Sequence, residues 1–257
     1  MKASKKIFLI DLVTLMPEMF EAFTKFGVVG RGFKKNFVAI DFINPRNFAT
    51  DNHKTIDDRA YGGGPGMVML ADPLIKSIES ARIREKSLGI KKRKVIHLTP
   101  KGSKLKHEKV KKLSGEAGLI LIASRYEGVD ERLNKWIDEE ISIGDFVTSG
   151  GELPAMLMMD ALIRQIPGVL NDIESVNQDS FVNGLLDHPS FTRPESVRGL
   201  KVPDILLSGD HEKIRIWRLK ESLKETKLKR PDLLINKSLT KEESRLLKEI
   251  EQEQEQG

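Results

Sequence analysis

The residues best suited to chemistry follow the apolar run Leu119–Ala123. The chain continues as Ser124-Arg-Tyr-Glu-Gly-Val-Asp-Glu-Arg132, which places five charged side chains within eight positions. Charged groups at the carboxyl end of a buried strand lie where open α/β sheets bind ligands. Capping and surface positions explain one or two such charges, but five are more than a cap requires. The stretch therefore predicts a polar binding loop.

A second candidate loop is Ile143–Pro154, which contains Gly144, Gly150 and Gly151 before an expected helix start near Glu152. Clustered glycines permit positive φ and let a ligand approach the backbone closely. Taken alone, the stretch is more typical of a plain strand-to-helix turn. Together with the charged loop, it indicates a site whose backbone groups hold a ligand.

These loops need strands behind them, and short apolar runs supply the strands. The patterns predict strands over Lys6–Val13, Phe37–Ile43, Val95–Leu98 and Leu119–Ala123, and helices from Pro17, over Asp72–Ser87 and from near Ser103. Alternating strands and helices favour an α/β sheet. Three turns, His97–Gly102, Ser124–Gly128 and Ile143–Gly151, then follow strand ends and are expected to form one pocket.

A third glycine-rich stretch is Tyr61-Gly-Gly-Gly-Pro-Gly-Met67. Its composition excludes a helix or strand interior and predicts an exposed or ligand-facing loop. No Gly-Lys-Ser/Thr follows it, so the stretch does not match a phosphate-binding P-loop.

Positive charge is concentrated in two regions. Lys91–Lys112 carries ten Lys and Arg against the single acid Glu108, and Leu200–Arg230 carries nine against five acids. Such runs are typical of solvated helix faces or of phosphate contact, and for the first run the two interpretations weigh about equally. In the second, His211 is expected to cap or precede a helix through Trp217, a residue more often in a core than on a base-stacking platform. A charged helix is expected over Lys241–Gly257.

Composition narrows the class of protein. The chain has 257 residues, 39% hydrophobic and 32% charged, with a net charge of +5, which is typical of a globular protein with one large or two modest domains. It has no cysteine, so disulfides and thiolate metal sites are excluded and a cytoplasmic location is expected. Neither an export signal nor a membrane span is predicted.

Several separated motifs, taken together, resemble the bacterial tRNA (guanine-N1)-methyltransferase family that modifies position 37 of the anticodon loop. The motifs occur in order over nearly the whole chain: Tyr61–Met67, Arg125–Arg132, Asp138–Asp145, Ser149–Ala155, Ile166–Leu170, Asp179–Phe181, Gly184–Asp187, Thr192–Pro194, Leu206–His211 and Trp217-Arg218. Many motifs in the right order are far more specific than any single glycine pattern.

The resemblance implies a SPOUT-type α/β fold, in which a parallel sheet is closed by a trefoil knot and followed by a small C-terminal helical domain. It implies a knotted S-adenosylmethionine-binding domain over 1–170, a flexible linker over 171–187 that carries Asp179, and a helical tRNA-binding domain over 188–257. It also implies a homodimer with its active site at the subunit interface, and the tRNA anticodon stem-loop as partner. Pattern reasoning alone would have excluded a knot.

Family positions carry over residue by residue. The cofactor-binding residues implied are His97, Leu98, Thr99, Pro100, Ser124, Glu127, Ser142, Ile143, Gly144, Phe146, Thr148, Gly150 and Gly151. Four of these depart from the family's usual residues: Ser124 stands for Gly, Phe146 for Tyr, Thr148 for Leu, and His97 for Tyr or another apolar residue. The Ser124 side chain enters a turn where the adenosyl group is expected to pass.

Methyl transfer to guanine N1 requires a base for the N1 proton and a donor that stabilises charge on O6. Asp179 and Arg164 match the family's catalytic positions for those roles. By pattern alone, Asp179 is more typical of a helix N-cap and Arg164 of a helix C-terminal cation. A free aspartic acid, with a pKa of ~3.9, is a weak base at pH 7, so its surroundings must raise its effectiveness.

RNA contact is assigned to six residues: Pro65, Gly66, Arg193, Lys213, Arg215 and Arg218. The family's use of Mg2+ makes Glu127 the candidate acidic group near the cofactor carboxylate, although no residue spacing assigns a metal site. Two other hypotheses rank below the methyltransferase. A non-catalytic RNA-binding protein would not bind S-adenosylmethionine saturably, and a nucleotide hydrolase lacks the P-loop lysine and hydroxyl.

Overall fold

The computed structural model describes residues 7–170, 178–235 and 237–255. The chain divides into two compact units, Met1–Ile173 and Glu174–Gly257, and each is considered by itself. The linker expected over 171–187 overlaps this division, and 171–177 lie outside the described residues. The domain boundaries stay a prediction.

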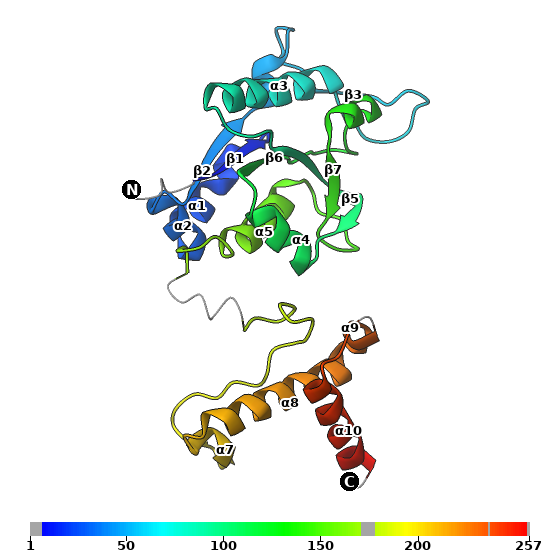
Figure 1. Ribbon diagram of the computed structural model, residues 1–257. Helices are drawn as coiled ribbons and strands as arrows, with labels where there is room; N and C mark the ends of the chain where they lie inside the picture. The colour runs from blue at the N-terminus through cyan, green and yellow to red at the C-terminus, as the bar shows by residue number, and fades with distance from the viewer. Residues whose placement is uncertain (1–6, 171–177, 236, 256–257) are drawn as a thin grey trace. The chain divides into compact units, whose positions relative to one another are not determined.

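The first unit is an α/β structure, as its strand and helix patterns predict (Figure 1). Its elements in chain order are β1 (Phe8–Val13), η1 (Pro17–Phe20), α1 (Glu21–Lys25), α2 (Gly27–Lys34), β2 (Val38–Ile43), η2 (Pro45–Phe48), β3 (Asp57–Asp58), β4 (Val68–Met69), α3 (Ala71–Ser87), β5 (Lys94–Lys104), α4 (His107–Ser114), β6 (Gly118–Ile122), η3 (Glu131–Trp136), β7 (Glu139–Ser142) and α5 (Glu152–Ile163).

Five of these strands form one parallel sheet in the order β2-β1-β6-β5-β7. Every residue of β6 is buried, as expected when helices cover both faces of a parallel sheet. On one face α2, α4 and α5 contribute Val29, Leu113 and Met158 to a core cluster. On the other, α3 contributes Leu74 and Ile78. Figure 1 shows α3 and α5 on opposite sides of the sheet.

The helix expected from Ser103 begins instead at His107. After a register shift beyond Leu98, Ser103 pairs with Ile141 and extends β5 to Lys104. Gly102 allows this extension, because a Cβ there would lie 2.4 Å from the Glu140 carbonyl carbon. This pairing with β7 is nonlocal, so the local turn signal at Pro100 could not reveal it.

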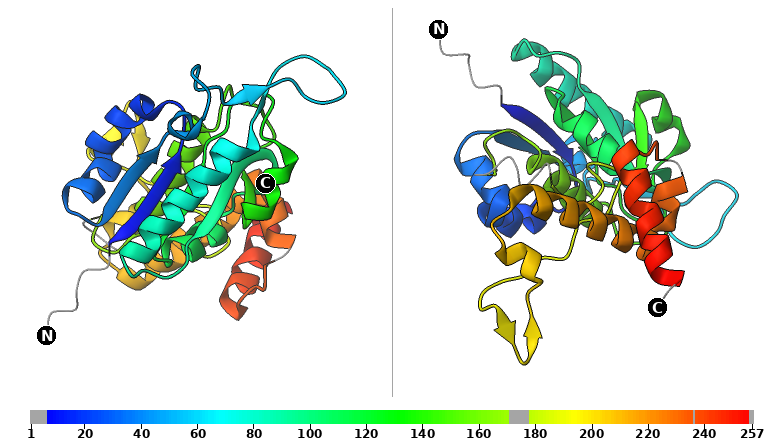
Figure 2. Two further views of the ribbon diagram at one scale, coloured as in Figure 1. Left: turned by 90° about the horizontal axis from the view of Figure 1, so that it is seen from above. Right: turned by 60° about the horizontal axis from the view of Figure 1, so that its bottom comes forward.

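The second unit contains β8 (Ser196–Val197), β9 (Leu200–Lys201), α7 (Asp204–Leu207), α8 (His211–Lys229), α9 (Pro231–Ile235) and α10 (Lys241–Glu255). The helical interpretation is wrong at Leu200, which pairs with Val197 in a hairpin. The yellow arrows in the right view of Figure 2 show this hairpin extending away from α7 and α8. The helix α8 is capped by Asp210, whose carboxylate accepts from the Lys213 N–H at 3.1 Å, and His211 is its first residue.

A small core holds the second unit together. It consists of Leu185, Leu223, Leu246 and Ile250, so α8, α10 and the turn around Leu185 pack on one another. The Leu186 N–H donates to Thr226 Oγ1 at 2.9 Å. The part of the expected linker that the structure describes therefore includes residues packed against α8. No described helix is long and apolar enough to cross a membrane.

Candidate cofactor-binding site

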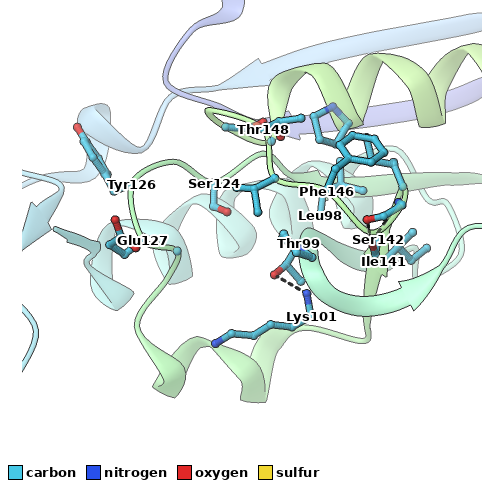
Figure 3. A pocket seen from close by; sticks show the side chains of 18 residues that line it. Leu98, Thr99, Lys101, Ser124, Tyr126, Glu127, Ile141, Ser142, Phe146 and Thr148 are labelled. Atoms are coloured by element: carbon cyan, nitrogen blue, oxygen red, sulfur yellow. Dashed lines mark hydrogen bonds between the residues drawn. The ribbon is translucent and has the colours of Figure 1, made fainter. Parts of the chain in front are cut away.

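The carboxyl ends of β6 and β7, together with the middle of β5 where its pairing with β7 shifts register after Leu98, open onto one pocket of about 240 Å³. All three predicted turns contribute to its wall, so the prediction that they form one pocket is confirmed. Its lining residues are Leu98, Thr99, Pro100, Lys101, Ser124, Tyr126, Glu127, Gly128, Ile141, Ser142, Ile143, Gly144, Phe146, Val147, Thr148, Gly150, Gly151 and Pro154. Figure 3 shows Tyr126 and Glu127 at one end and Phe146, Ser142 and Ile141 at the other.

The turn after β7 is held by its own short hydrogen bonds. Ser142 Oγ donates to the Gly144 carbonyl at 2.9 Å, and the Gly144 N–H lies 3.2 Å from the same Oγ. Gly144 has a φ of 157°, a conformation that L side chains rarely adopt. Thr148 Oγ1 donates to the Gly150 carbonyl at 2.9 Å. The turn is thus preorganised, with its backbone exposed to the pocket.

Gly150 and Gly151 serve a different purpose from the positive φ that the sequence suggested. Neither Gly150 nor Gly151 has a positive φ. A Cβ on Gly151 would lie 2.6 Å from Ala123 Cα, and one on Gly150 would lie 2.6 Å from Glu152 Oε2. The Gly151 N–H donates to the Ser124 carbonyl at 2.7 Å. These glycines let the turn after β7 pack against the turn after β6.

The turn after β6 is anchored by a buried carboxylate on α5. Glu152 is fully buried, and its Oε1 accepts from Thr14 Oγ1 at 3.0 Å and from Arg125 Nε at 3.2 Å. Arg125 is therefore held by an ion pair within the protein. The charged residues of this turn, which the sequence singled out, serve partly to fix its conformation.

The glycine-rich loop before β4 reaches the rim of the pocket. The side chain of Tyr61 is fully exposed, whereas a Cβ on Gly66 would lie 2.4 Å from Glu127 Cγ. The Glu127 N–H donates to the Met67 carbonyl at 2.9 Å. Pro65 and Gly66, expected to contact RNA, thus lie next to a residue of the pocket.

Twelve of the thirteen residues expected to bind cofactor line this pocket, and His97 is the exception. His97 is buried behind the wall, with Nε2 at 2.9 Å from Ser124 Oγ and Nδ1 at 3.2 Å from Glu140 Oε1. Burial lowers the pKa of His97, the hydrogen bond with Glu140 opposes that shift, and the Lys101 charge adds to it.

Sequence reasoning missed six lining residues: Lys101, Tyr126, Gly128, Ile141, Val147 and Pro154. Four of them lie inside the predicted turns, so taking each turn whole would have found them, and Pro154 lies in the first turn of α5 at the end of the candidate loop Ile143–Pro154. Ile141 lies one residue before Ser142 on β7, and only the register of β5 with β7 brings it to the pocket.

The two residues expected to be catalytic lie in different units. Arg164 forms the C-cap of α5 in the first unit. Asp179 belongs to a turn of the second unit, where its carbonyl accepts from the Val182 N–H at 3.3 Å. Their catalytic roles therefore stay predictions.

The residues expected to bind RNA in the second unit differ in how they are paired. On α8, Arg215 binds Glu212 and Glu242 at 2.8 and 2.7 Å, and these two partners raise its pKa. Lys213 lies 3.1 Å from Asp210. Arg218 and Arg193 are exposed, and neither has an ion-pair partner within the residues that the structure describes.

Trp217 precedes Arg218 on α8, among the residues expected to bind RNA. Its ring centroid is 6.4 Å from that of Phe191, with the rings tilted by 52°. The side chain is partly buried, and it lies outside the cluster formed by Leu185, Leu223, Leu246 and Ile250. It packs against Phe191, whose side chain is 47% exposed.

Comparison with known proteins places this chain in a family. The model of the family described as tRNA (Guanine-1)-methyltransferase TrmD matches residues 8–236. The chain belongs to this family. The resemblance of the motifs is thereby confirmed, and the parallel sheet agrees with the SPOUT class that the family represents.

Curated relatives cover nearly the whole chain. A tRNA (guanine-N(1)-)-methyltransferase of Methylobacillus flagellatus is 60% identical over 245 residues, 95% of this chain and 93% of the relative. Proteins of the same name from Chromobacterium violaceum and Nitrosospira multiformis are 53% and 54% identical, over 95% and 94% of this chain and 96% of each relative. Both units therefore have counterparts in these proteins.

Proposed function

We propose that this protein is an S-adenosylmethionine-dependent tRNA methyltransferase that methylates N1 of guanine 37 in the anticodon loop. The observation that carries the proposal is the pocket shared by the turns after β6 and β7 and by the middle of β5, within a chain whose family match extends over residues 8–236. The names of the relatives support guanine N1 as the atom. Position 37 rests on the motif resemblance.

The pocket has the features that S-adenosylmethionine requires. Apolar side chains such as Leu98, Ile141 and Phe146 offer surface for an adenine ring, while the turn at Gly144 exposes backbone groups. A mostly preformed pocket of apolar walls with a few polar groups is typical of small-molecule sites. When bound, the cofactor supplies a methyl group on a positively charged sulfur, and the residues of this chain hold and orient it.

The remaining chemistry is proton transfer and charge stabilisation. We assign Asp179 as the base that takes the N1 proton, and Arg164 as the cation that stabilises negative charge on O6. Both assignments rest on matching motif positions. The homodimer, in which a partner subunit completes each site, and the knot rest on the same resemblance. The cytoplasmic location rests on the absence of cysteine.

Mg2+ is proposed only as an ion held jointly by the protein and its substrates. The described residues contain no group of three or more His, Cys, Asp or Glu side chains that could hold a metal. Glu127 is an exposed carboxylate of the pocket wall, and Mg2+ is commonly held by one or two carboxylates together with substrate oxygens. No step of the reaction is assigned to the ion.

Incubation with radiolabelled S-adenosylmethionine and tRNA transcripts that differ only at position 37 tests the proposal. The transcript with guanine at position 37 is expected to gain one labelled methyl group at N1, and the transcript with adenine there none. Saturable cofactor binding without transfer to either transcript would favour a different methyl acceptor. RNA binding without any cofactor binding would identify a non-catalytic RNA-binding protein.

RNA contact by α8 predicts unequal effects of two neighbouring arginines. Arg218→Ala is expected to weaken tRNA binding about 5- to 10-fold and to lower the slope of log affinity against log salt by about 1, because an exposed cation on a phosphate is lost. Arg215→Ala is the matched control with a smaller loss, since Arg215 already pairs with Glu212 and Glu242. Filter binding over a salt series measures both, and equal losses would contradict the assignment.

A further inference from the structure

Three buried or partly buried polar side chains, two from strands and one from the turn after a third strand, meet behind the cofactor pocket. His97 on β5 lies between Ser124, in the turn after β6, and Glu140 on β7. His97 is 3% exposed and Ser124 8%, whereas the Glu140 side chain is 34% exposed. Ser124 also lines the pocket. The chain of hydrogen bonds therefore connects the pocket wall, through a buried imidazole, to a carboxylate at the surface.

The direction of these hydrogen bonds follows from the chemistry of the groups. An ionised carboxylate can only accept, so Glu140 requires a proton on Nδ1 of His97. In a neutral imidazole Nε2 is then an acceptor, and the Ser124 hydroxyl must donate its proton to it. Burial favours the neutral form, in agreement with the lowered pKa of His97.

The orientation of the Ser124 hydroxyl sets what it offers to a ligand. Its proton points away from the pocket toward His97, so only oxygen lone pairs remain for a bound molecule. The backbone of Ser124 is fixed as well, because its carbonyl accepts from the Gly151 N–H at 2.7 Å. Figure 3 shows Ser124 in the middle of the pocket wall, between Glu127 and the turn of Phe146.

We propose that Glu140, His97 and Ser124 form a hydrogen-bonded relay that presents Ser124 Oγ to the cofactor as a fixed hydrogen-bond acceptor. The inference rests on the proposed function, since it assumes that S-adenosylmethionine occupies this pocket. The cofactor atom opposite Ser124 is then a donor, such as a hydroxyl or an N–H. Glu140 and His97 are positioning residues, because they act on the ligand only through Ser124.

The relay makes cofactor affinity depend on pH in a defined direction. The groups facing His97 are Ser124 from the turn after β6, Glu140 from β7 and Lys101 from β5 itself. When the pH falls through the lowered pKa of His97, Nε2 gains a proton and donates to Ser124 Oγ. The hydroxyl proton must then turn into the pocket, so the acceptor is lost. Affinity is therefore constant at pH 6.5, the usual pKa of histidine, and above it, and falls only at the more acidic pH where His97 with its lowered pKa takes up a proton.

Calorimetric titration with S-adenosylmethionine tests the relay in the full-length protein. Ser124→Ala is expected to raise Kd about 3- to 10-fold, the size of one net hydrogen bond. His97→Phe leaves the Ser124 hydroxyl free to rotate, so the Kd of this variant is expected to rise less than that of Ser124→Ala. Its affinity should also no longer fall below pH 6.5. Ser114→Ala is the matched control on α4, since its hydroxyl donates to the Lys111 carbonyl away from the pocket. Wild-type affinity in Ser124→Ala would overturn the relay and leave the proposed function standing.

Nitrogen-15 NMR of the imidazole tests the relay without any ligand. The chain has five histidines, and loss of one signal set in His97→Phe assigns the resonances. The expected spectrum at pH 8 shows the proton on Nδ1. Glu140→Gln changes a partly exposed side chain, so the variant is expected to fold. It should weaken the preference of the proton for Nδ1. A proton on Nε2 in the wild-type protein would overturn the relay even if the cofactor binds as proposed, whereas failure of the wild-type protein to bind S-adenosylmethionine would overturn both.

Discussion

Asp179→Ala is expected to lower the rate of methyl transfer by at least about 100-fold while leaving S-adenosylmethionine affinity unchanged. A positioned general base contributes roughly 10²- to 10⁴-fold, and guanine N1 cannot attack while it keeps its proton. All lining residues of the proposed cofactor pocket belong to the first unit, whereas Asp179 belongs to the second. Loss of the carboxylate should therefore affect chemistry and leave cofactor binding intact. Single-turnover transfer of a radiolabelled methyl group to tRNA, combined with calorimetric titration, separates the two quantities.

Two further variants make this result specific. Asp179→Asn keeps the size of the side chain and removes its basicity, so it should be nearly as slow as Asp179→Ala. Asp204→Ala removes an exposed carboxylate from the first turn of α7 in the same unit and should keep the wild-type rate. A near-normal single-turnover rate in Asp179→Ala would remove the base assignment, and equal losses in all three variants would indicate an effect of charge or folding in the second unit.

The local part of the fold could be predicted from the sequence, because its signals are local. Strand β6 is an uninterrupted apolar run, and the turns that follow β6 and β7 contain the glycine and charged residues expected there. The turn expected over His97–Gly102 lies instead within β5, at the point where its pairing with β7 shifts register. Since parallel strands end at a common edge, placing the turns after β6 and β7 in one pocket required only the sheet type. The order β2-β1-β6-β5-β7 was beyond this reasoning, because strand order depends on tertiary packing.

The relationships that the sequence did not reveal join residues far apart in the chain. His97 meets Ser124 and Glu140 at separations of 27 and 43 residues, and nothing in the residues near His97 indicates either partner. Similarly, Arg215 on α8 pairs with Glu242 on α10, so an arginine that is part of a cationic run is neutralised by a helix that follows later. Residue type suggested what these side chains can do, but the fold decides which of them are available.

Asp11→Ala is expected to destabilise the first unit by about 3 kcal/mol, because it leaves a buried arginine without its main partner. Asp11 is fully buried in β1, and its carboxylate pairs with Arg84 and with Arg93. The Arg93 side chain is 1% exposed. Removing one member of a buried ion pair typically costs about 3–5 kcal/mol. The low end applies here, because Glu85 Oε2 remains 3.3 Å from Arg93 Nε.

Denaturant unfolding followed by circular dichroism measures this loss, with two comparisons that separate burial from charge. Asp41→Ala removes an exposed carboxylate, 3.5 Å from the same Arg84, and should cost no more than about 1 kcal/mol, as surface pairs do. The double variant Asp11→Leu with Arg93→Met replaces both charges by apolar groups and should recover much of the stability lost in Asp11→Ala. A loss in Asp11→Ala as small as that in Asp41→Ala would mean that Arg93 reaches water or another partner when Asp11 is removed. The buried pair would then contribute little to joining β1, α3 and the start of β5 on the face of the sheet covered by α3.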